Sequence, residues 1–208
     1  MRYDASHKER TRTRILDAAA ALFRREGYQG VGIDRIMAEA DLTRGGFYAH
    51  FASKAELFAE VLGRESDFVR RLRASGDAAA VIGGYLDPRN RERVGGGCPL
   101  ASLTNEMPRR DAAARAAFSG QVEALVGELG ALLDTEEGTA ESTAESTAEG
   151  TASCAAEGAV RERALLAVVL CVGAIGLARG VDDEALASEI LDVARARALE
   201  ALGAAAEA

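Results

Sequence analysis

Apolar residues recur at helical spacing along the chain, beginning close to its N-terminus. Residues 6–9, Ser-His-Lys-Glu, have the Ser-x-x-Glu form of a capping box, which marks the start of a helix. One apolar stripe with the spacing of a single helix face follows: Ile15, Leu16, Ala19, Leu22 and Phe23. We predict that Gly27 ends this helix in a left-handed conformation and that Tyr28 folds back onto its last turn.

Two shorter helices are predicted next, joined by a tight turn. The first has four apolar residues on one face: Ile33, Ile36, Met37 and Ala40. It stops near Asp41, a residue that adopts a left-handed turn conformation more readily than most. Thr43 suits the N-cap of the second helix, in which we expect Phe47 and Phe51 to point inward.

A long fourth helix is predicted over residues 54–73. Residues 53–56, Ser-Lys-Ala-Glu, repeat the capping-box pattern at its start. Seven apolar residues follow at helical spacing: Leu57, Phe58, Val61, Leu62, Phe68, Val69 and Leu72. This helix would act as a lever between a small head and the rest of the chain.

The remaining pattern also predicts helices only. They are expected near 77–86, 98–107, 110–133 and 160–179, with a loop at 88–97 and a last helix that starts at 182–184. Residues 134–158 repeat TAES, TAES, TAEG and TAS, small polar residues that cannot build a core, so we interpret them as a mobile or disordered connection. The prediction is an all-α fold with a three-helix domain at 1–53 and a larger helical domain at 54–208.

The charge distribution adds to this picture. The 208 residues carry a net charge of -8, yet residues 1–54 hold 10 Lys and Arg against 7 Asp and Glu. A mildly basic head on an acidic body can meet phosphate with one face. The three cysteines show no metal-ligand spacing, the first residues lack a secretory signal, and the longest apolar run is short for a membrane span. We expect a cytoplasmic protein without metal or cofactor and without a membrane partner.

Two short helices joined by a tight turn, the second of which begins Thr-Arg-Gly-Gly, are typical of a helix-turn-helix. The second helix of such a pair enters the DNA major groove with its N-terminal residues foremost. Its first amides lack internal partners and carry the positive end of the helix dipole, so they suit an approaching phosphate. Gly45 and Gly46 would let this turn come close to DNA or to the neighbouring helix.

Residues 10–62 resemble the N-terminal DNA-binding domain of TetR-family transcriptional regulators. The matching segments are ALFRREGY, IDRIMAEADLT and GGFYAHFASKAEL. The resemblance implies a homodimeric repressor that binds a pseudo-palindromic operator in double-stranded DNA. It also implies a small-molecule effector, bound by the C-terminal body, that releases the DNA. The segment GGGCPLASLTNEM resembles one subgroup, in which Gly-Cys-Pro-Leu opens a helix of the ligand-binding body.

The resemblance places DNA contacts at seven positions: Thr43, Arg44, Gly45, Gly46, Tyr48, His50 and Lys54. Thr43 and Tyr48 resemble phosphate contacts, His50 and Lys54 further backbone contacts, and Arg44 a base-reading position where arginine pairs with guanine. Lys54 is one of only two lysines among 25 cationic residues, and we predict a compact point charge to a phosphate. Three positions depart from the family pattern and leave the operator sequence open: Gly32, Asp41 and Gly46.

Candidate effector-binding residues come from the apolar faces of the middle helices: Tyr85, Cys98, Leu100, Leu103, Met107, Phe118 and Val122. Cys98 at a helix N-terminus is placed to be a reactive thiol, so a repressor that senses electrophiles or oxidants is an alternative. The other interpretation of Cys98 is a small buried residue lining a cavity.

A third hypothesis is a helical enzyme or carrier with a vestigial head. The sequence offers little for catalysis, since it has only two histidines and no Ser/His/Asp pattern, so we predict no catalytic residues. The apolar helix at 160–179 and the last helix are predicted to form a four-helix interface with a second subunit. The alternative for the apolar helix is complete burial within one subunit.

Overall fold

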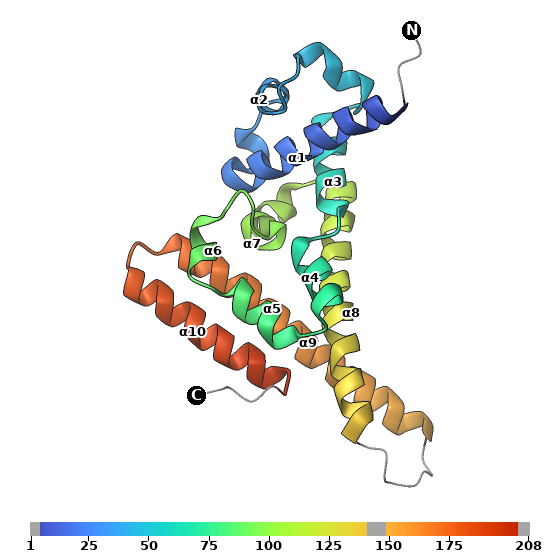
Figure 1. Ribbon diagram of the computed structural model, residues 1–208, viewed down its shortest axis with the longest axis vertical. Helices are drawn as coiled ribbons and strands as arrows, with labels where there is room; N and C mark the ends of the chain where they lie inside the picture. Colours follow the sequence, from blue (N-terminus) through green and yellow to red (C-terminus); the bar gives the residue numbers. More distant parts are fainter. Residues whose placement is uncertain (1–4, 141–148, 204–208) are drawn as a thin grey trace. The chain divides into compact units, whose positions relative to one another are not determined.

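The computed structural model describes residues 5–140 and 149–203, and all regular structure in these ranges is helical. The all-α prediction is therefore confirmed (Figure 1). The chain divides into two compact units. The first unit comprises Met1–Arg64 and Arg93–Gln121, and the second comprises Glu65–Glu92 and Val122–Ala208. This division differs from the predicted boundary after residue 53, because a later segment of the chain packs with the N-terminal helices.

The first unit is built from four N-terminal helical segments and the elements of that later segment. They are α1 (Ala5–Gly30), α2 (Ile33–Glu39), the 3-10 helix η1 (Arg44–Ala49), α3 (Lys54–Gly63), α7 (Pro99–Leu103), the 3-10 helix η2 (Thr104–Arg109) and the start of α8 (Ala112–Ala140). Helix α1 begins at Ala5, so Ser6 lies in its first turn and not at the predicted cap. The predicted break at Gly27 is confirmed, and its φ of 72 is positive as expected. Its ψ of 170 is extended, so the predicted left-handed helical conformation is wrong. The Tyr28 ring folds back onto Phe23, with 5.9 Å between the centroids.

The core of the first unit contains the predicted apolar stripe. Its N-terminal members include Ile15, Leu22, Phe23, Ile36, Phe47, Phe51, Leu57 and Phe58, all buried. Leu103, Met107 and Ala114 are buried in the same cluster. Because complete burial of a large apolar side chain contributes about 1.5–3 kcal/mol, Leu103 and Met107 tie the later segment to the N-terminal helices.

The turn between α2 and η1 has the predicted form. Asp41 has φ 54, and the Leu42 amide donates to the Met37 carbonyl oxygen over 2.8 Å. Thr43 is extended and precedes the helix, but within the described part of the chain its side chain forms no cap hydrogen bond. The following helix is a 3-10 helix that ends at Ala49, where an α-helix was expected. Two adjacent glycines disfavour a longer α-helix here, and the Gly46 amide closes a tight i→i+3 bond to the Thr43 carbonyl, 3.1 Å long.

The predicted long helix over 54–73 is wrong: it is two helices, α3 (Lys54–Gly63) and α4 (Asp67–Ser75). Arg64 is extended, and Ser66 caps α4 by accepting a hydrogen bond from the Val69 amide over 3.2 Å. The division between the two units falls in this break. The apolar spacing continues across the break, which is why the pattern alone did not reveal it. A single rigid lever helix is therefore absent from this part of the described chain.

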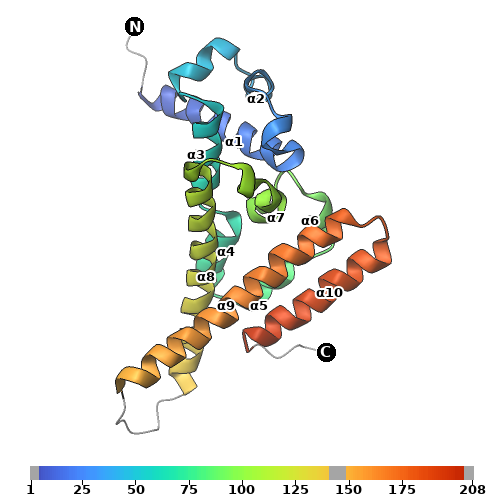
Figure 2. The ribbon, with the colours of Figure 1, turned by 180° about the vertical axis from the view of Figure 1, so that it is seen from behind.

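The second unit contains α4, α5 (Ala78–Tyr85), α6 (Arg89–Glu92), α9 (Glu149–Gly180), α10 (Glu184–Ala201) and the rest of α8. The short α6 lies in the predicted loop at 88–97. Asp183 caps α10 by accepting from the Ala185 amide over 2.8 Å. Helices α9 and α10 run side by side in opposite directions (Figures 1 and 2). Arg91 closes the C-terminal end of α9 by donating to the Ala178 carbonyl over 2.6 Å.

Part of the predicted mobile connection at 134–158 is helical. Helix α8 continues to Ala140, and α9 starts at Glu149. The central part of the repeat, residues 141–148, lies outside the described residues.

Candidate nucleic-acid interface

The N-terminal half of η1 forms an exposed polar face over a buried aromatic support. Thr43, Arg44 and Gly45 are exposed, while Phe47 beneath them is fully buried. The Tyr48 side chain is 62% exposed, and its ring stands edge-on to Phe47 with 5.2 Å between the centroids. A tyrosine held in this way presents its hydroxyl to solvent from a rigid base. The structure thus brings these predicted DNA-binding residues together on one face.

The two glycines of η1 are not required by packing inside the chain. A Cβ at Gly45 would meet no described atom within 4 Å outside its own neighbours. At Gly46 it would lie 3.7 Å from the Met37 Cε, an ordinary van der Waals distance. The idea that these glycines allow close approach to the neighbouring helix is therefore wrong. The other explanation, that Gly45 and Gly46 allow DNA to come close to the backbone, stays a prediction.

Arg44 is the first residue of η1, and its guanidinium pairs with a carboxylate on α2. Its Nη1 lies 2.8 Å from Oδ2 of Asp34, and both side chains are 65% exposed. Exposed ion pairs contribute about 0–1 kcal/mol. The pair therefore adds little to the stability of the fold.

Arg14 of α1 supports the turn before η1, a role that the sequence did not reveal. Its Nη2 donates to the Ala40 carbonyl over 2.6 Å, and this carbonyl lies at the C-terminal end of α2. Carbonyls at a helix end lack intrahelical partners, so a guanidinium there fixes the path of the following turn. Nothing in the sequence separates Arg14 from the other arginines of α1.

Lys54 has a different environment from the one predicted. Its Nζ donates to the Tyr28 and Val31 carbonyl oxygens, both over 2.9 Å, and lies 4.1 Å from the centre of the Tyr28 ring. Burial, followed by the charge of Arg110, lowers the pKa of Lys54. Two of the three N–H groups of the ammonium thus donate to carbonyls at the corner between α1 and α2. Lys54 therefore ties α3 to this corner, and its contact with a phosphate stays a prediction.

The same corner is held from the later segment by η2. Both carboxylate oxygens of Glu106 accept from the Tyr28 amide, over 2.9 and 3.1 Å. The Arg110 guanidinium lies 4.3 Å from the centre of the Tyr28 ring. An amide bonded to a carboxylate is worth about 1.5–3 kcal/mol, so η2 is an integral support of the helix-turn-helix.

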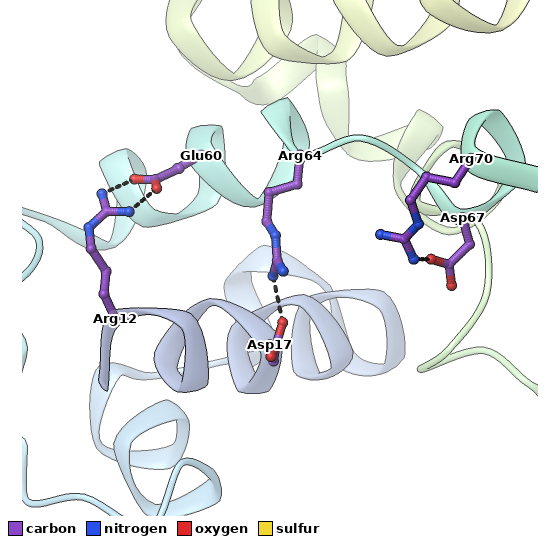
Figure 3. A network of polar contacts seen from close by, with 6 residues as sticks. All are labelled: Arg12, Asp17, Glu60, Arg64, Asp67 and Arg70. Atoms are coloured by element: carbon purple, nitrogen blue, oxygen red, sulfur yellow. Dashed lines mark hydrogen bonds and ion pairs between the residues drawn. The ribbon is translucent and has the colours of Figure 1, made fainter. Parts of the chain in front are cut away.

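Ion pairs also tie α1 to α3. Figure 3 shows the guanidinium of Arg12 on α1 facing the carboxylate of Glu60 on α3, and Arg64 reaching Asp17 over 2.6 Å. The Arg12 guanidinium lies 4.6 Å from the centre of the Phe51 ring, just after η1. The third pair in the figure, Asp67 with Arg70, is local to α4. The contacts of Arg12 and Arg64 hold α3, which follows η1 in the chain, against α1.

His50 follows η1 and is half-buried. Its Nδ1 is buried without a hydrogen-bond partner among the residues that the structure describes. Burial, then the positive charges of Lys8 and Arg12, lower the pKa of His50 below its usual 6.5. The lowered pKa favours the neutral imidazole of His50 in the free protein.

The lowered pKa of His50 predicts a pH-dependent stability. The unfolded chain takes up a proton at His50 as the pH falls through about 6.5, while the folded protein resists until a lower pH. Folding stability is therefore retained above this range and falls as the pH drops through it. We expect the loss between pH 7.5 and 5.5, measured by urea unfolding, to be smaller in His50→Gln. Identical losses in both proteins would contradict the proposed environment of His50.

The candidate effector residues are distributed over both units. Leu103 and Met107 belong to the core of the first unit, and Phe118 packs against it. Leu100 is buried, and Cys98 is half-buried at the N-cap of α7. In the second unit, Val122 is half-buried and the Tyr85 ring stands edge-on to Phe68, 5.0 Å between centroids. The candidate residues Leu103, Met107 and Phe118 therefore support the N-terminal helices directly. An effector site made of all seven candidate residues stays a prediction.

A buried aromatic base, an exposed N-terminal face and a tight turn after a short helix define a helix-turn-helix DNA-binding domain. Residues 15–61 match the family model described as bacterial regulatory proteins, tetR family. The chain is 35% identical to the HTH-type transcriptional regulator TtgW of Pseudomonas putida, over 41% of this chain and 68% of that protein. The chain belongs to the TetR family of bacterial regulators.

Other relatives agree over shorter parts of their length. The chain is 35% identical to the HTH-type transcriptional repressor KstR of Mycolicibacterium smegmatis, over 60% of this chain and 59% of that protein. It is 48% identical to the repressor SCO4008 of Streptomyces coelicolor, over 28% of this chain and 30% of that protein. These matches thus span 59% and 30% of the length of those two relatives.

Similarity to solved structures extends over nearly the whole chain. A TetR transcriptional regulator from Chloroflexus aurantiacus is 26% identical with a TM-score of 0.68, covering 94% of this chain and 96% of that one. A TetR-family regulator from Cytophaga hutchinsonii has a TM-score of 0.71 at 19% identity, covering 97% of this chain and 98% of that one. The second likeness supports the fold alone.

Proposed function

We propose that this protein is a transcriptional repressor that binds a pseudo-palindromic operator as a homodimer and leaves it when a small molecule binds. The observation that carries the proposal is the exposed face of η1, on which Thr43, Arg44 and Tyr48 stand over the buried ring of Phe47. Membership of a family of DNA-binding regulators supports it.

On DNA, η1 enters the major groove with its N-terminus foremost. Arg44 reads a guanine through two parallel N–H bonds to O6 and N7. Thr43 and Tyr48 donate to phosphate oxygens, and these contacts set the register without reading sequence. Gly45, with open space around its Cα among the described residues, lets the groove wall or a phosphate approach the backbone.

The dimer is proposed to form through α9 and α10. On α9, Leu166, Val169 and Leu177 recur on one face and stay exposed in the single chain, and Leu186 and Val193 do the same on α10. The segment Glu157–Gly180 is long and apolar enough to cross a membrane, and 39% of its most apolar stretch is buried within the single chain. A second copy covering the rest of this surface explains the apolar composition. A two-fold dimer matches half-sites about one helical turn apart.

Release by an effector requires two states with different DNA affinity. A small molecule shifts the equilibrium only by as much as it prefers the state that does not bind DNA. The middle helices supply the apolar surface for such a ligand, and its identity is open. Cys98 is partly accessible in the first unit, which keeps the thiol-sensing alternative in view without favouring it.

The test is a comparison of Arg44→Ala with the wild type on DNA. Duplexes selected from a random pool, and the region upstream of the protein's own gene, serve as probes in a gel-shift titration. We expect the variant to lose about 1–3 kcal/mol at one operator position and to accept all four bases there.

Arg35→Ala is the matched control. Arg35 lies on α2, is exposed, and pairs with Glu26 over 2.8 Å, as Arg44 does with Asp34. Its replacement should leave base preference unchanged. If the wild type bound no duplex at low ionic strength, the proposed function would be wrong.

A further inference from the structure

The exposed pair between Asp34 and Arg44 joins the two helices of the helix-turn-helix. Asp34 lies in the first turn of α2, and Arg44 is the first residue of η1. Arg44 Nη1 donates to Asp34 Oδ2 over 2.8 Å. Both side chains are 65% exposed, so the pair adds little to the stability of the fold. The pair therefore calls for an explanation in terms of what Arg44 binds.

We propose that Asp34 is a specificity-determining residue that positions the Arg44 guanidinium to read a guanine. This inference rests on the proposed function and deepens it, because it adds a second residue to the base-reading contact. Asp34 does not touch the base in this proposal. It acts through Arg44.

The first part of the mechanism is orientation. An arginine has five N–H donors in a rigid fork, and the carboxylate of Asp34 engages Nη1. The edge formed by Nε and Nη2 has no hydrogen-bond partner among the described residues, and it presents two parallel N–H bonds. Two parallel donors are what guanine O6 and N7 accept. Holding Nη1 also reduces the side-chain entropy that must be lost when Arg44 binds a base.

The second part is charge. Free arginines on a DNA-binding surface contribute to binding of any sequence through phosphate contacts. A carboxylate bonded to Arg44 cancels its charge and repels phosphates that approach the same point. The pair then adds little to the affinity for DNA of any sequence, while its hydrogen bonds add to the affinity for a site with guanine at this position. Asp34 is therefore expected to lower affinity for unrelated DNA while it raises discrimination.

The experiment is a double-mutant cycle on the full chain with Asp34→Asn, Arg44→Ala and the double variant. Each protein is titrated with the duplex selected by the wild type, with the three duplexes that carry another base in place of the guanine read by Arg44, and with an unrelated duplex of equal length. We expect Asp34→Asn to reduce discrimination at that guanine about tenfold and to bind the unrelated duplex several-fold more tightly. In the Arg44→Ala background, Asp34→Asn should leave discrimination unchanged.

Glu26→Gln is the matched control, because it breaks an ion pair of the same length, to Arg35, away from η1. Glu26→Gln should alter neither the discrimination at the guanine nor the affinity for the unrelated duplex. All variants should keep the thermal unfolding midpoint of the wild type, because exposed ion pairs add little to stability.

An equal change on every duplex would mean that Asp34 acts by charge alone and would overturn the proposal. So would an equal loss of discrimination with and without Arg44. If Arg44→Ala relaxes base preference and Asp34→Asn does not, Asp34 is excluded while the proposed function stands. Absence of wild-type binding to any duplex overturns both.

Discussion

Replacing Val169 with aspartate should convert the dimer into a monomer and weaken operator binding about 100-fold or more. Val169 is 64% exposed in the middle of the apolar face of α9, between Leu166 and Leu177. In the proposed dimer this face is covered by the second subunit, so the new carboxylate would be buried without a partner. Near a two-fold axis it would also meet its own copy. Burying an unpaired charge is too costly for an interface of this kind to tolerate.

The loss of DNA affinity follows from the loss of avidity. In a dimer, binding of one head places the second head at a high effective concentration near its half-site, which raises overall affinity by about 10²–10⁴. A monomer contacts one half-site alone. Sedimentation equilibrium gives the mass, and a gel-shift titration on operator and on an isolated half-site gives both affinities. We expect the variant to bind the two duplexes almost equally.

Ala116→Asp is the control for this change. Ala116 is exposed on α8 in the first unit, so the substitution adds the same charge away from the apolar face. It should leave both mass and affinity unchanged. A Val169→Asp protein that stays dimeric and binds as tightly as the wild type would exclude the face of α9 as the interface.

The helix-turn-helix could be predicted because its signals are local. Phe47 and Phe51 were expected to point inward, and both are buried. The positive φ of Asp41 and the break at Gly27 follow from the preferences of single residues. The capping box at the start of α3 is also present, with the Glu56 amide donating to the Ser53 hydroxyl over 3.0 Å. In each case the residues that decide the conformation lie within one or two turns of each other.

The errors concern interactions between distant segments. Leu103 and Met107 show an apolar pattern that fits a ligand pocket as well as a core, and only the fold reveals that they pack under the N-terminal helices. The break at Ser66 is hidden because the apolar spacing continues through it. A serine among polar residues is a common sight on a helix surface. The cap at Ser66 therefore becomes evident only from the backbone.

The candidate site shows the same limit. Exposure of Arg44 and Tyr48 agrees with the roles that the family resemblance implies. Lys54 was expected to act as a point charge to a phosphate, and the sequence did not reveal that its ammonium is bonded to carbonyls more than 20 positions earlier. Asp34 was not singled out, since one carboxylate on a short amphipathic helix is usually solvated. Both residues gain their meaning from a partner that is distant in sequence.

Gly27→Ala should destabilise the first unit by about 2–5 kcal/mol, from two separate costs. Gly27 has φ 72 and ψ 170, a conformation that glycine alone adopts readily, and other residues lose about 1–3 kcal/mol there. A Cβ at this position would also overlap Oε1 of Glu106. That oxygen accepts from the Tyr28 amide, so it cannot move without weakening a bond to a charged group. Urea unfolding followed by circular dichroism measures the sum.

The two costs can be separated with Glu106. In the Glu106→Ala background the overlap is gone, so Gly27→Ala should cost only the backbone part, and the two substitutions should be less than additive. Gly120→Ala is the control of opposite sign: Gly120 lies within α8 in the same unit, and a Cβ there would meet no described atom within 4 Å beyond its own helix. Alanine should stabilise that position by up to about 1 kcal/mol. If both glycines responded alike, Gly27 would have no special backbone role. The coupling of η2 to the corner between α1 and α2 would then rest on the bond between the Tyr28 amide and the Glu106 carboxylate alone.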